Sequence, residues 1–202
     1  MPLQKIIISD SSKLYLWKIT ETVAELLSLF SAKIPEKYLR FNSPEHQAQF
    51  LAKELLLRYL KIDKQLDYLD SGKPVLRNGA YISVSHSRNW VGIALSSQEI
   101  GMDMEFANPK LIKIASKFVH PSEHEILDVN NVMDLQFLWT AKESIYKLAG
   151  QKGLRFKEDI ILQNFDRKKL QAEFLLFMNT LLKIVYHKLD GDFITARAVY
   201  DK

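Results

Sequence analysis

Residues 99–106 read EIGMDMEF, with apolar side chains on alternate positions and two carboxylates, Asp103 and Glu105, in the gaps. On a β-strand, residues two apart share one face and lie roughly 6.5 Å apart, so these carboxylates can converge. Converging carboxylates repel each other unless a cation lies between them. Mg²⁺ fits this role because it takes hard oxygen ligands from one or two carboxylates together with substrate phosphates. The alternative is that both side chains face water on an exposed sheet.

A second group lies in WTAKESIYKL, residues 139–148, where Trp139, Glu143 and Lys147 recur four residues apart along one helix stripe. Glu143 and Lys147 can form an ordinary exposed ion pair. An exposed stripe, however, gains nothing from a tryptophan, whereas a carboxylate and an ammonium beside a cleft can bind metal and phosphate together. Lys142, one position round the helix, adds a second cation.

Two further segments carry candidate phosphate ligands. In VSHS, residues 84–87, His86 stands at a strand-to-turn transition with Ser85 and Ser87 beside it. The alternative for His86 is a hydrogen-bonded structural histidine. Lys73 lies in SGKPVL on a turn fixed by proline, where a lysine is usually solvated. Neither a P-loop nor a glycine-rich dinucleotide-binding motif is present in the sequence, so neither type of site is predicted.

Composition narrows the class of protein. The 202 residues are 47% hydrophobic and 26% charged, which suits one large domain or two domains with well-buried cores. The chain has no cysteine, which excludes disulfides and thiolate metal sites. The net charge of +4 favours anionic partners, but no arginine-rich arm singles out nucleic acid. The N-terminal apolar run is too short for a signal peptide or a membrane span, so we expect a cytoplasmic protein.

The hydrophobic pattern predicts an α+β protein. The expected helices cover residues 20–30, 43–60, 108–119, 121–127 and 131–150. The expected strands cover residues 4–9, 13–19, 80–86, 90–96, 100–106, 158–165, 169–178, 181–189 and 192–200. This order suits two α+β halves that meet near residues 106–109, and clefts at such junctions commonly bind ligands.

The segments GKP, VSHS, IGMDME, KFVHPSEHE, WTAKESIYK and QKGL occur in the order typical of 4′-phosphopantetheinyl transferases. The chain resembles most closely the long, surfactin-synthetase-activating type, over residues 36–154. The resemblance rests mainly on G-x-D-x-E followed by W-x-x-K-E-x-x-x-K. It implies an α+β monomer of two similar α/β halves, residues 1–106 and 107–202, related by a pseudo-twofold axis with the active site between them.

The resemblance also implies a metal site, for Mg²⁺ or Mn²⁺, made by Asp103, Glu105 and Glu143. Coenzyme A would lie between the halves, with Lys147 neutralising its pyrophosphate, His86 at its 3′-phosphate and Lys73 near the nucleotide end. The residues expected to contact coenzyme A are Lys73, Ser85, His86, Lys142 and Lys147. Glu123 falls at another acidic position that the family often uses around the site.

The implied reaction is attack by a serine hydroxyl of an apo acyl or peptidyl carrier protein on the β-phosphate of coenzyme A. The phosphopantetheine arm is transferred and adenosine 3′,5′-bisphosphate leaves. Lys147 and Glu143 would be catalytic, with Glu143 accepting the serine proton directly or through a water. Carrier proteins are typically acidic beside the modified serine, which suits the positive charge of this chain. No nucleic acid or membrane partner is expected.

One position departs from the family, and two other functions compete. The family's surfactin type often carries an arginine for the 3′-phosphate where this chain has Gln49, so Lys53 or Arg40 would have to compensate. A metal-dependent nuclease or phosphodiesterase would also need clustered acids and a lysine, but with a stronger basic track and the lysine on a strand beside the acids. A non-catalytic carrier-binding module is the third possibility, against which the intact acids and Lys147 argue.

Overall fold

The computed structural model describes residues 5–8, 11–31, 34, 36–189, 191 and 193–201. The strands are β1 (Lys5–Ile8), β2 (Ser12–Lys18), β3 (Leu66–Tyr68), β4 (Pro74–Leu76), β5 (Tyr81–Ser87), β6 (Trp90–Ser96), β7 (Gly101–Phe106), β8 (Ile160–Asp166), β9 (Gln171–Leu176), β10 (Thr180–Lys188) and β11 (Phe193–Tyr200). The α-helices are α1 (Val23–Ser28), α2 (Pro44–Tyr59), α3 (Lys110–Ile114) and α4 (Val132–Ala149). Short 3₁₀ turns cover Glu36–Arg40, Asp63–Gln65, Ala115–Lys117 and Pro121–Glu125.

Two antiparallel sheets organise the chain. The first has the strand order β1-β2-β6-β5, and the second has the order β7-β11-β10-β9-β8. The α+β class is therefore confirmed, with one large sheet in each half and a separate two-stranded sheet, β3-β4, in the first half. The predicted division after Phe106 is placed one strand too late, because β7 pairs with β11 over its whole length and so belongs to the second sheet. The change of sheet falls at residues 97–100, between β6 and β7.

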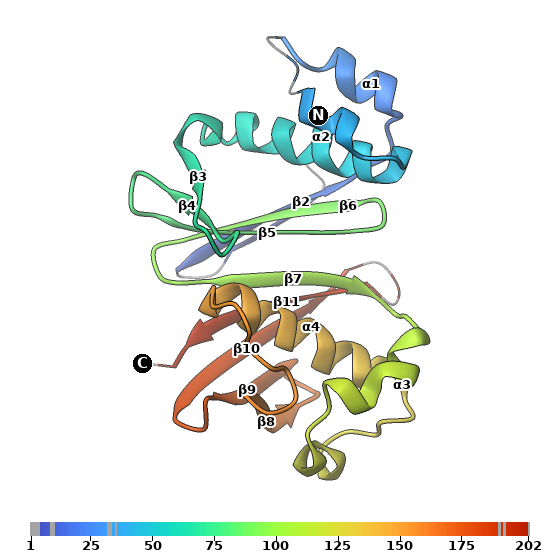
Figure 1. Ribbon diagram of the computed structural model, residues 1–202, viewed down its shortest axis with the longest axis vertical. Helices are drawn as coiled ribbons and strands as arrows, with labels where there is room; N and C mark the ends of the chain where they lie inside the picture. Colours follow the sequence, from blue (N-terminus) through green and yellow to red (C-terminus); the bar gives the residue numbers. More distant parts are fainter. Residues whose placement is uncertain are drawn as a thin grey trace.

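The two sheets lie next to each other in the middle of the molecule, with α2 beyond the first sheet and α4 alongside the strands of the second (Figure 1). Helix α2 packs on the first sheet and α4 packs on the second, each over its own apolar core. A third core lies between the sheets, and its buried residues are Leu14, Leu16, Trp90, Ala94, Ile100, Met102, Met104 and Phe193. Burying one such large side chain stabilises the fold by about 1.5–3 kcal/mol, so the two halves are joined by a substantial apolar contact.

Helix boundaries follow local hydrogen bonding. Helix α2 begins as predicted, since the Ser43 side chain accepts a hydrogen bond from the backbone N–H of His46 and Pro44 takes the first helical position. Helix α1 begins later than predicted. Its cap is Thr22 and not Thr20, because Thr22 and Glu25 form a reciprocal capping box.

Two further differences from the expected elements are local. The turn at residues 70–74 joins β3 to β4, and strands of three residues are too short to show an alternating pattern. The helix expected over 108–119 breaks into α3 and a 3₁₀ turn. Positions 4, 9 and 192 of the expected strands lie outside the described residues. Among the described residues, none of the helices has the length and apolar character needed to cross a membrane.

Candidate active site

Strand β5 runs along β7 through a ladder of serine side chains. The Ser83 hydroxyl accepts a hydrogen bond from the backbone N–H of Met102 at 2.9 Å. Further along, the Ser85 hydroxyl donates to Oδ1 of Asp103 at 2.7 Å. The alternating serines in SVSHS therefore mark the face of β5 that meets β7. Sequence reasoning used Ser85 but missed Ser83, although the period of two was a usable signal.

The site centre lies where α4 meets this pair of strands. Lys147 of α4 donates through Nζ to Oδ1 of Asp103 at 2.7 Å and to the Ser85 hydroxyl at 3.0 Å. Beside them, the Ser87 hydroxyl donates to Oε2 of Glu105 at 3.1 Å. The fold thus brings together Asp103, Glu105 and Lys147, which the sequence placed on two separate elements.

The backbone of β7 is held from both sides. Gln136 of α4 donates to the carbonyl of Glu105 at 2.6 Å, and Thr195 of β11 donates to the carbonyl of Asp103 at 2.8 Å. Gly101 lies so close to α4 that a Cβ there would come within 1.9 Å of the Ser144 carbonyl oxygen. The close packing buries Asp103, which is 4% exposed. Both faces of β7 are therefore covered, whereas the alternation suggested one open face.

The three carboxylates share an unfavourable charge. Burial, followed by the charge of Asp103, raises the pKa of Glu105 to about 7, with Glu143 adding to the rise and Ser87 and Lys147 opposing it. Burial and Asp103 also raise the pKa of Glu143, which Lys147 partly offsets. Both directions mean that the charged forms lack a counter-charge in this arrangement.

Asp103, Glu105 and Glu143 offer the oxygen ligands that a hard divalent cation takes. Within the described part of the chain, no three His, Cys, Asp or Glu side chains already form a metal-binding group. However, Oδ2 of Asp103 is buried and accepts no hydrogen bond from any described residue. A buried oxygen without a partner is costly, and a bound cation would supply the missing partner while relieving the charge on Glu105 and Glu143. The residues would suit a hard divalent cation, to which they offer carboxylate oxygens.

A pocket of about 170 Å³ opens beside this centre, between β5 and the last turn of α4. Its walls include Ile82, Val84 and Pro74 from the first half, and Tyr146 and Lys147 from α4. Sequence reasoning did not identify Tyr146, although it precedes Lys147 in the motif. The pocket therefore joins apolar walls to the ammonium that contacts Asp103.

Lys73 also lines this pocket, but its ammonium is engaged elsewhere. Its Nζ donates to the carbonyl oxygen of Leu148, near the end of α4, at 2.5 Å. Burial lowers the pKa of Lys73, and the charge of Glu99 opposes that shift. The sequence placed Lys73 near the nucleotide, and the structure adds a backbone partner for it in the other half.

His86 lies on the opposite face of β5 from Ser85, because neighbouring strand residues alternate. Partial burial lowers the pKa of His86, and the positive charges of Lys147, His46 and Lys53 lower it further, with Asp103 opposing them. The two residues therefore do not act on one point, as their proximity in the sequence had suggested. His86 instead belongs to a positive region shared with α2.

Gln49, at the position of the family arginine, is 4% exposed. Its side-chain amide donates to the backbone carbonyl of Arg88 at 2.6 Å and so holds the turn between β5 and β6. Lys53 lies one helical turn further along α2, and its positive charge lowers the pKa of His86. The structure thus gives Gln49 a local role in positioning that turn.

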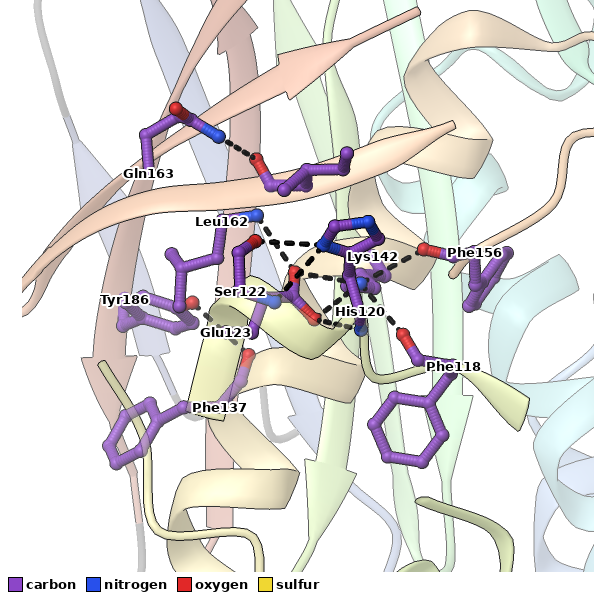
Figure 2. Close-up of polar contacts among 11 residues, drawn as sticks. Phe118, His120, Ser122, Glu123, Phe137, Lys142, Phe156, Leu162, Gln163 and Tyr186 are labelled. Carbon is purple, nitrogen blue, oxygen red and sulfur yellow. Dashed lines mark hydrogen bonds and ion pairs between the residues drawn. The ribbon is translucent and has the colours of Figure 1, made fainter. Parts of the chain in front are cut away.

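The expectation that Lys142 contacts coenzyme A is wrong. Lys142 is 0% exposed, and its Nζ donates to the carbonyls of Phe118 and Phe156 at 2.7 and 2.9 Å and to the Glu123 carboxylate at 2.9 Å (Figure 2). Successive helix residues point about 100° apart, so the residue beside Glu143 faces the interior instead of the pocket. Its three donors are all used by protein acceptors.

Glu123 is likewise fully buried, and it accepts hydrogen bonds from the backbone N–H groups of His120 and Leu162 as well as from Lys142 (Figure 2). This acid therefore stabilises the core of the second half instead of facing Asp103, Glu105 and Glu143. Trp139 packs edge-on against Phe118, with ring centroids 5.1 Å apart. Core packing therefore explains the tryptophan of the motif.

Sequence comparison identifies relatives of this chain among known proteins. Residues 99–196 match the model of the 4′-phosphopantetheinyl transferase superfamily. The chain is 32% identical over 154 residues to the 4′-phosphopantetheinyl transferase ffp of Bacillus subtilis, an alignment that covers 69% of this chain and 68% of that protein. The chain belongs to the 4′-phosphopantetheinyl transferase superfamily.

Two other relatives show how similar the chain is to further known proteins. The chain is 32% identical over 147 residues to the 4′-phosphopantetheinyl transferase Sfp of Bacillus subtilis (strain 168), covering 66% of this chain and 65% of that protein. It is 25% identical over 138 residues to enterobactin synthase component D of Salmonella typhi, covering 66% and 56%. The chain thus spans about two-thirds of the length of its B. subtilis relatives. The superfamily segment contains the three carboxylates and Lys147, whereas Lys73 and His86 precede it.

Proposed function

We propose that this protein transfers the 4′-phosphopantetheine arm of coenzyme A to a serine of an apo carrier protein and releases adenosine 3′,5′-bisphosphate. The observation that carries the proposal is the convergence of Asp103, Glu105, Glu143 and Lys147 beside a pocket between the halves. Membership of the 4′-phosphopantetheinyl transferase superfamily supports the choice of reaction.

The carboxylates of Asp103, Glu105 and Glu143 would hold one Mg²⁺, or Mn²⁺ in its place. The orphaned Oδ2 of Asp103 and the raised pKa values of the other two acids support this ligand set. When bound, the ion supplies positive charge to the pyrophosphate as charge develops on the leaving group. Phosphoryl transfer depends chiefly on such positioning and charge neutralisation.

Lys147 is placed to supply charge from the protein itself. Its ammonium donates to Asp103 and Ser85, and Lys147 also lines the pocket. A short movement of the side chain would therefore bring the ammonium to a phosphate bound in that pocket. The incoming serine oxygen forms a bond to the β-phosphorus, and the bond from that phosphorus to the bridging oxygen breaks. The bridging oxygen leaves with adenosine 3′,5′-bisphosphate.

Glu143 would receive the proton of the serine hydroxyl. Without a bound ion, burial and Asp103 raise the pKa of its carboxyl. As a ligand of the ion, the same carboxylate would be a weaker base, so the proton would reach it either directly or through a water. The nucleotide would occupy the pocket with Pro74 and Tyr146 on its walls, and the 3′-phosphate would lie at His86 and Lys53. The pocket's 170 Å³ is below the roughly 300–1,000 Å³ of typical ligand sites, so it would hold only part of coenzyme A.

The partner would be an acidic acyl or peptidyl carrier protein, because a net charge of +4 speeds encounters with acidic surfaces. The test is incubation with coenzyme A, Mg²⁺ and a panel of apo carriers, followed by intact-mass measurement of each carrier. We expect one carrier to gain a single phosphopantetheine, and a carrier whose serine is replaced by alanine to gain none. Binding of carriers without any gain in mass across the panel would favour a non-catalytic module and contradict the proposal.

A further inference from the structure

The last turn of α4 contains backbone carbonyls that the helix itself cannot satisfy, as at every helix end. The N–H of Gly150 donates to the Tyr146 carbonyl at 3.0 Å. The Leu148 carbonyl accepts its hydrogen bond from Nζ of Lys73, a residue 75 positions earlier in the chain and in the other half. One helix end is therefore capped by a side chain from across the pocket.

The Lys73 side chain reaches the helix end because residue 150 is a glycine and has no side chain in the way. A Cβ on Gly150 would lie 2.5 Å from Cδ of Lys73, which is closer than real Cβ atoms approach. Gly150 also has a φ of +61°, the left-handed conformation common after a helix end. Gly153 has a φ of +81° as well, but a Cβ there would meet nothing within 4 Å. The contact with Lys73 therefore distinguishes Gly150 from a second left-handed glycine three residues later.

The same helical turn carries Lys147, whose ammonium contacts Asp103 and Ser85. The first half of the chain thus holds this turn at two points, through Lys73 on its backbone and through Ser85 on its side chain. A cation near a helix C-terminus is favourable because it faces the negative end of the helix dipole. Removing the ammonium would leave the Leu148 carbonyl without its partner and loosen the turn.

We propose that Lys73 is a positioning residue: by capping the end of α4 across the pocket, it fixes the placement of Lys147 against Asp103. This inference rests on the proposed transfer reaction. It gives Lys73 a role through α4 instead of a role as a direct ligand of the 3′-phosphate. The two roles differ in one measurable respect, because a phosphate ligand matters only when the phosphate is present.

The kinetic test compares Lys73→Met with the wild type, using coenzyme A and 3′-dephospho-coenzyme A at saturating Mg²⁺. Small misplacements of catalytic groups are costly, so we expect kcat to fall about 10-fold or more, by the same factor with both substrates. A loss seen with coenzyme A alone would make Lys73 a phosphate ligand and overturn the inference. Lys157→Met is the matched control, since Lys157 also donates to a backbone carbonyl, that of Ser116 at 3.0 Å, but within the second half.

Hydrogen exchange supplies a readout that needs no substrate. In Lys73→Met, the amides of residues 147–150 should exchange about 10-fold faster than in the wild type, while Lys73→Arg, which keeps a donor, should retain most of the protection. Unchanged exchange in Lys73→Met would contradict the capping role. If the wild type transferred nothing to any carrier, the proposed function would fail, and the exchange result would still decide whether Lys73 caps the helix.

Two alanine substitutions, at Gly150 and at Gly153, test the same contact without altering Lys73. Gly150→Ala should displace Lys73 and reproduce the faster exchange at residues 147–150, whereas Gly153→Ala carries similar backbone strain and should leave that exchange unchanged. Combining Gly150→Ala with Lys73→Met should add little to either change alone. Full additivity, or equal effects of the two alanine substitutions, would overturn the inference.

Discussion

The Lys147 ammonium lies 2.7 Å from Oδ1 of Asp103 and joins two elements that are 44 residues apart in the sequence. Asp103 is nearly covered, with 6% of its side chain exposed, whereas Lys147 is 28% exposed. The second carboxylate oxygen of Asp103 has no partner among the described residues. In the absence of a metal ion, the lysine therefore provides the counter-charge for an acid that has a free coordination position.

This relationship predicts that Lys147 and a divalent cation compete for Asp103. Lys147→Met should destabilise the metal-free protein by about 1–3 kcal/mol, because it removes the charged donor of the buried Asp103 carboxylate and leaves only the Ser85 hydroxyl. It should also increase the rise in melting temperature that Mg²⁺ produces, while abolishing transfer. Thermal unfolding with and without Mg²⁺ measures both effects. A smaller Mg²⁺ response in the variant than in the wild type would contradict the competition.

The pKa of Glu105 predicts the pH dependence of metal-free stability. Its value of about 7, against an ordinary 4.5, means that between these pH values the native carboxyl holds a proton which the unfolded chain has lost. The stabilisation from this group is therefore present below about pH 4.5 and is lost as the pH rises through 7, by at most about 3 kcal/mol.

Urea unfolding at pH 5.5 and pH 8.0 without metal tests this sign. The difference in unfolding free energy between the two pH values should shrink in Glu105→Gln and stay unchanged in Glu158→Gln, which alters an exposed carboxylate. Mg²⁺ should stabilise the wild type more at pH 8.0 than at pH 5.5, because the acids are then charged. An equal pH difference in the wild type and Glu105→Gln would show that this group is not responsible.

The buried pair of Lys142 and Glu123 should be strongly coupled. Both side chains are 0% exposed, so removing one partner leaves an uncompensated buried charge, which costs about 3–5 kcal/mol. The double variant Lys142→Met/Glu123→Gln should therefore be less destabilised than the sum of the single variants. Denaturant unfolding of the four proteins measures the coupling energy.

A surface pair provides the matched comparison. The Nη2 atom of Arg155 lies 2.8 Å from Oδ1 of Asp159, and 65% of the arginine side chain is exposed. Ion pairs this exposed stabilise a fold by about 0–1 kcal/mol. The same cycle at this pair should give a coupling energy well below that of Lys142 and Glu123. Similar coupling at both pairs would mean that burial does not control the strength of the inner one.

Gly101 is expected to be essential for the approach of β7 to α4. In Gly101→Ala the new Cβ would meet the backbone of Ser144 and Leu148, neither of which can move without displacing the helix. We expect a loss of about 1–3 kcal/mol or more, measured by thermal or urea unfolding. Gly79→Ala serves as the comparison: a Cβ there meets nothing within 4 Å, so its loss reports only the backbone strain of an alanine at a φ of +79°, without a clash. Equal stability losses in the two variants would argue against the close contact.

Much of the fold could be predicted from local sequence signals. The alternation in EIGMDMEF gave its strand, and Ser43 followed by Pro44 gave the start of α2. Local patterns do not determine which strands pair, and so the partnership of β7 with β11, formed across some 90 residues of chain, could not be read from the pattern. Strands β7 and β11 both contribute side chains to the single apolar core between the two sheets.

The site was predictable where the spacing of residues along a strand or a helix determines which way their side chains point. Asp103 and Glu105 share a strand face, and Glu143 and Lys147 share a helix stripe, which is why their convergence could be expected. The prediction for Lys142 was wrong because it followed proximity in the sequence and not the helical angle between neighbours. The partner of Lys73 could not be foreseen, since a lysine on a turn shows no preference for a helix end in another half.

The proposed function requires Asp103 and Glu143 to belong to one transfer site. The most direct measurement is the rate at which Asp103→Asn and Glu143→Gln modify an apo carrier that the wild type modifies, followed by intact-mass spectrometry. With the fold verified by thermal unfolding and Glu158→Gln as the control, we predict that both rates fall by about 10²-fold or more. Near-normal turnover by either variant would contradict the assignment of the site.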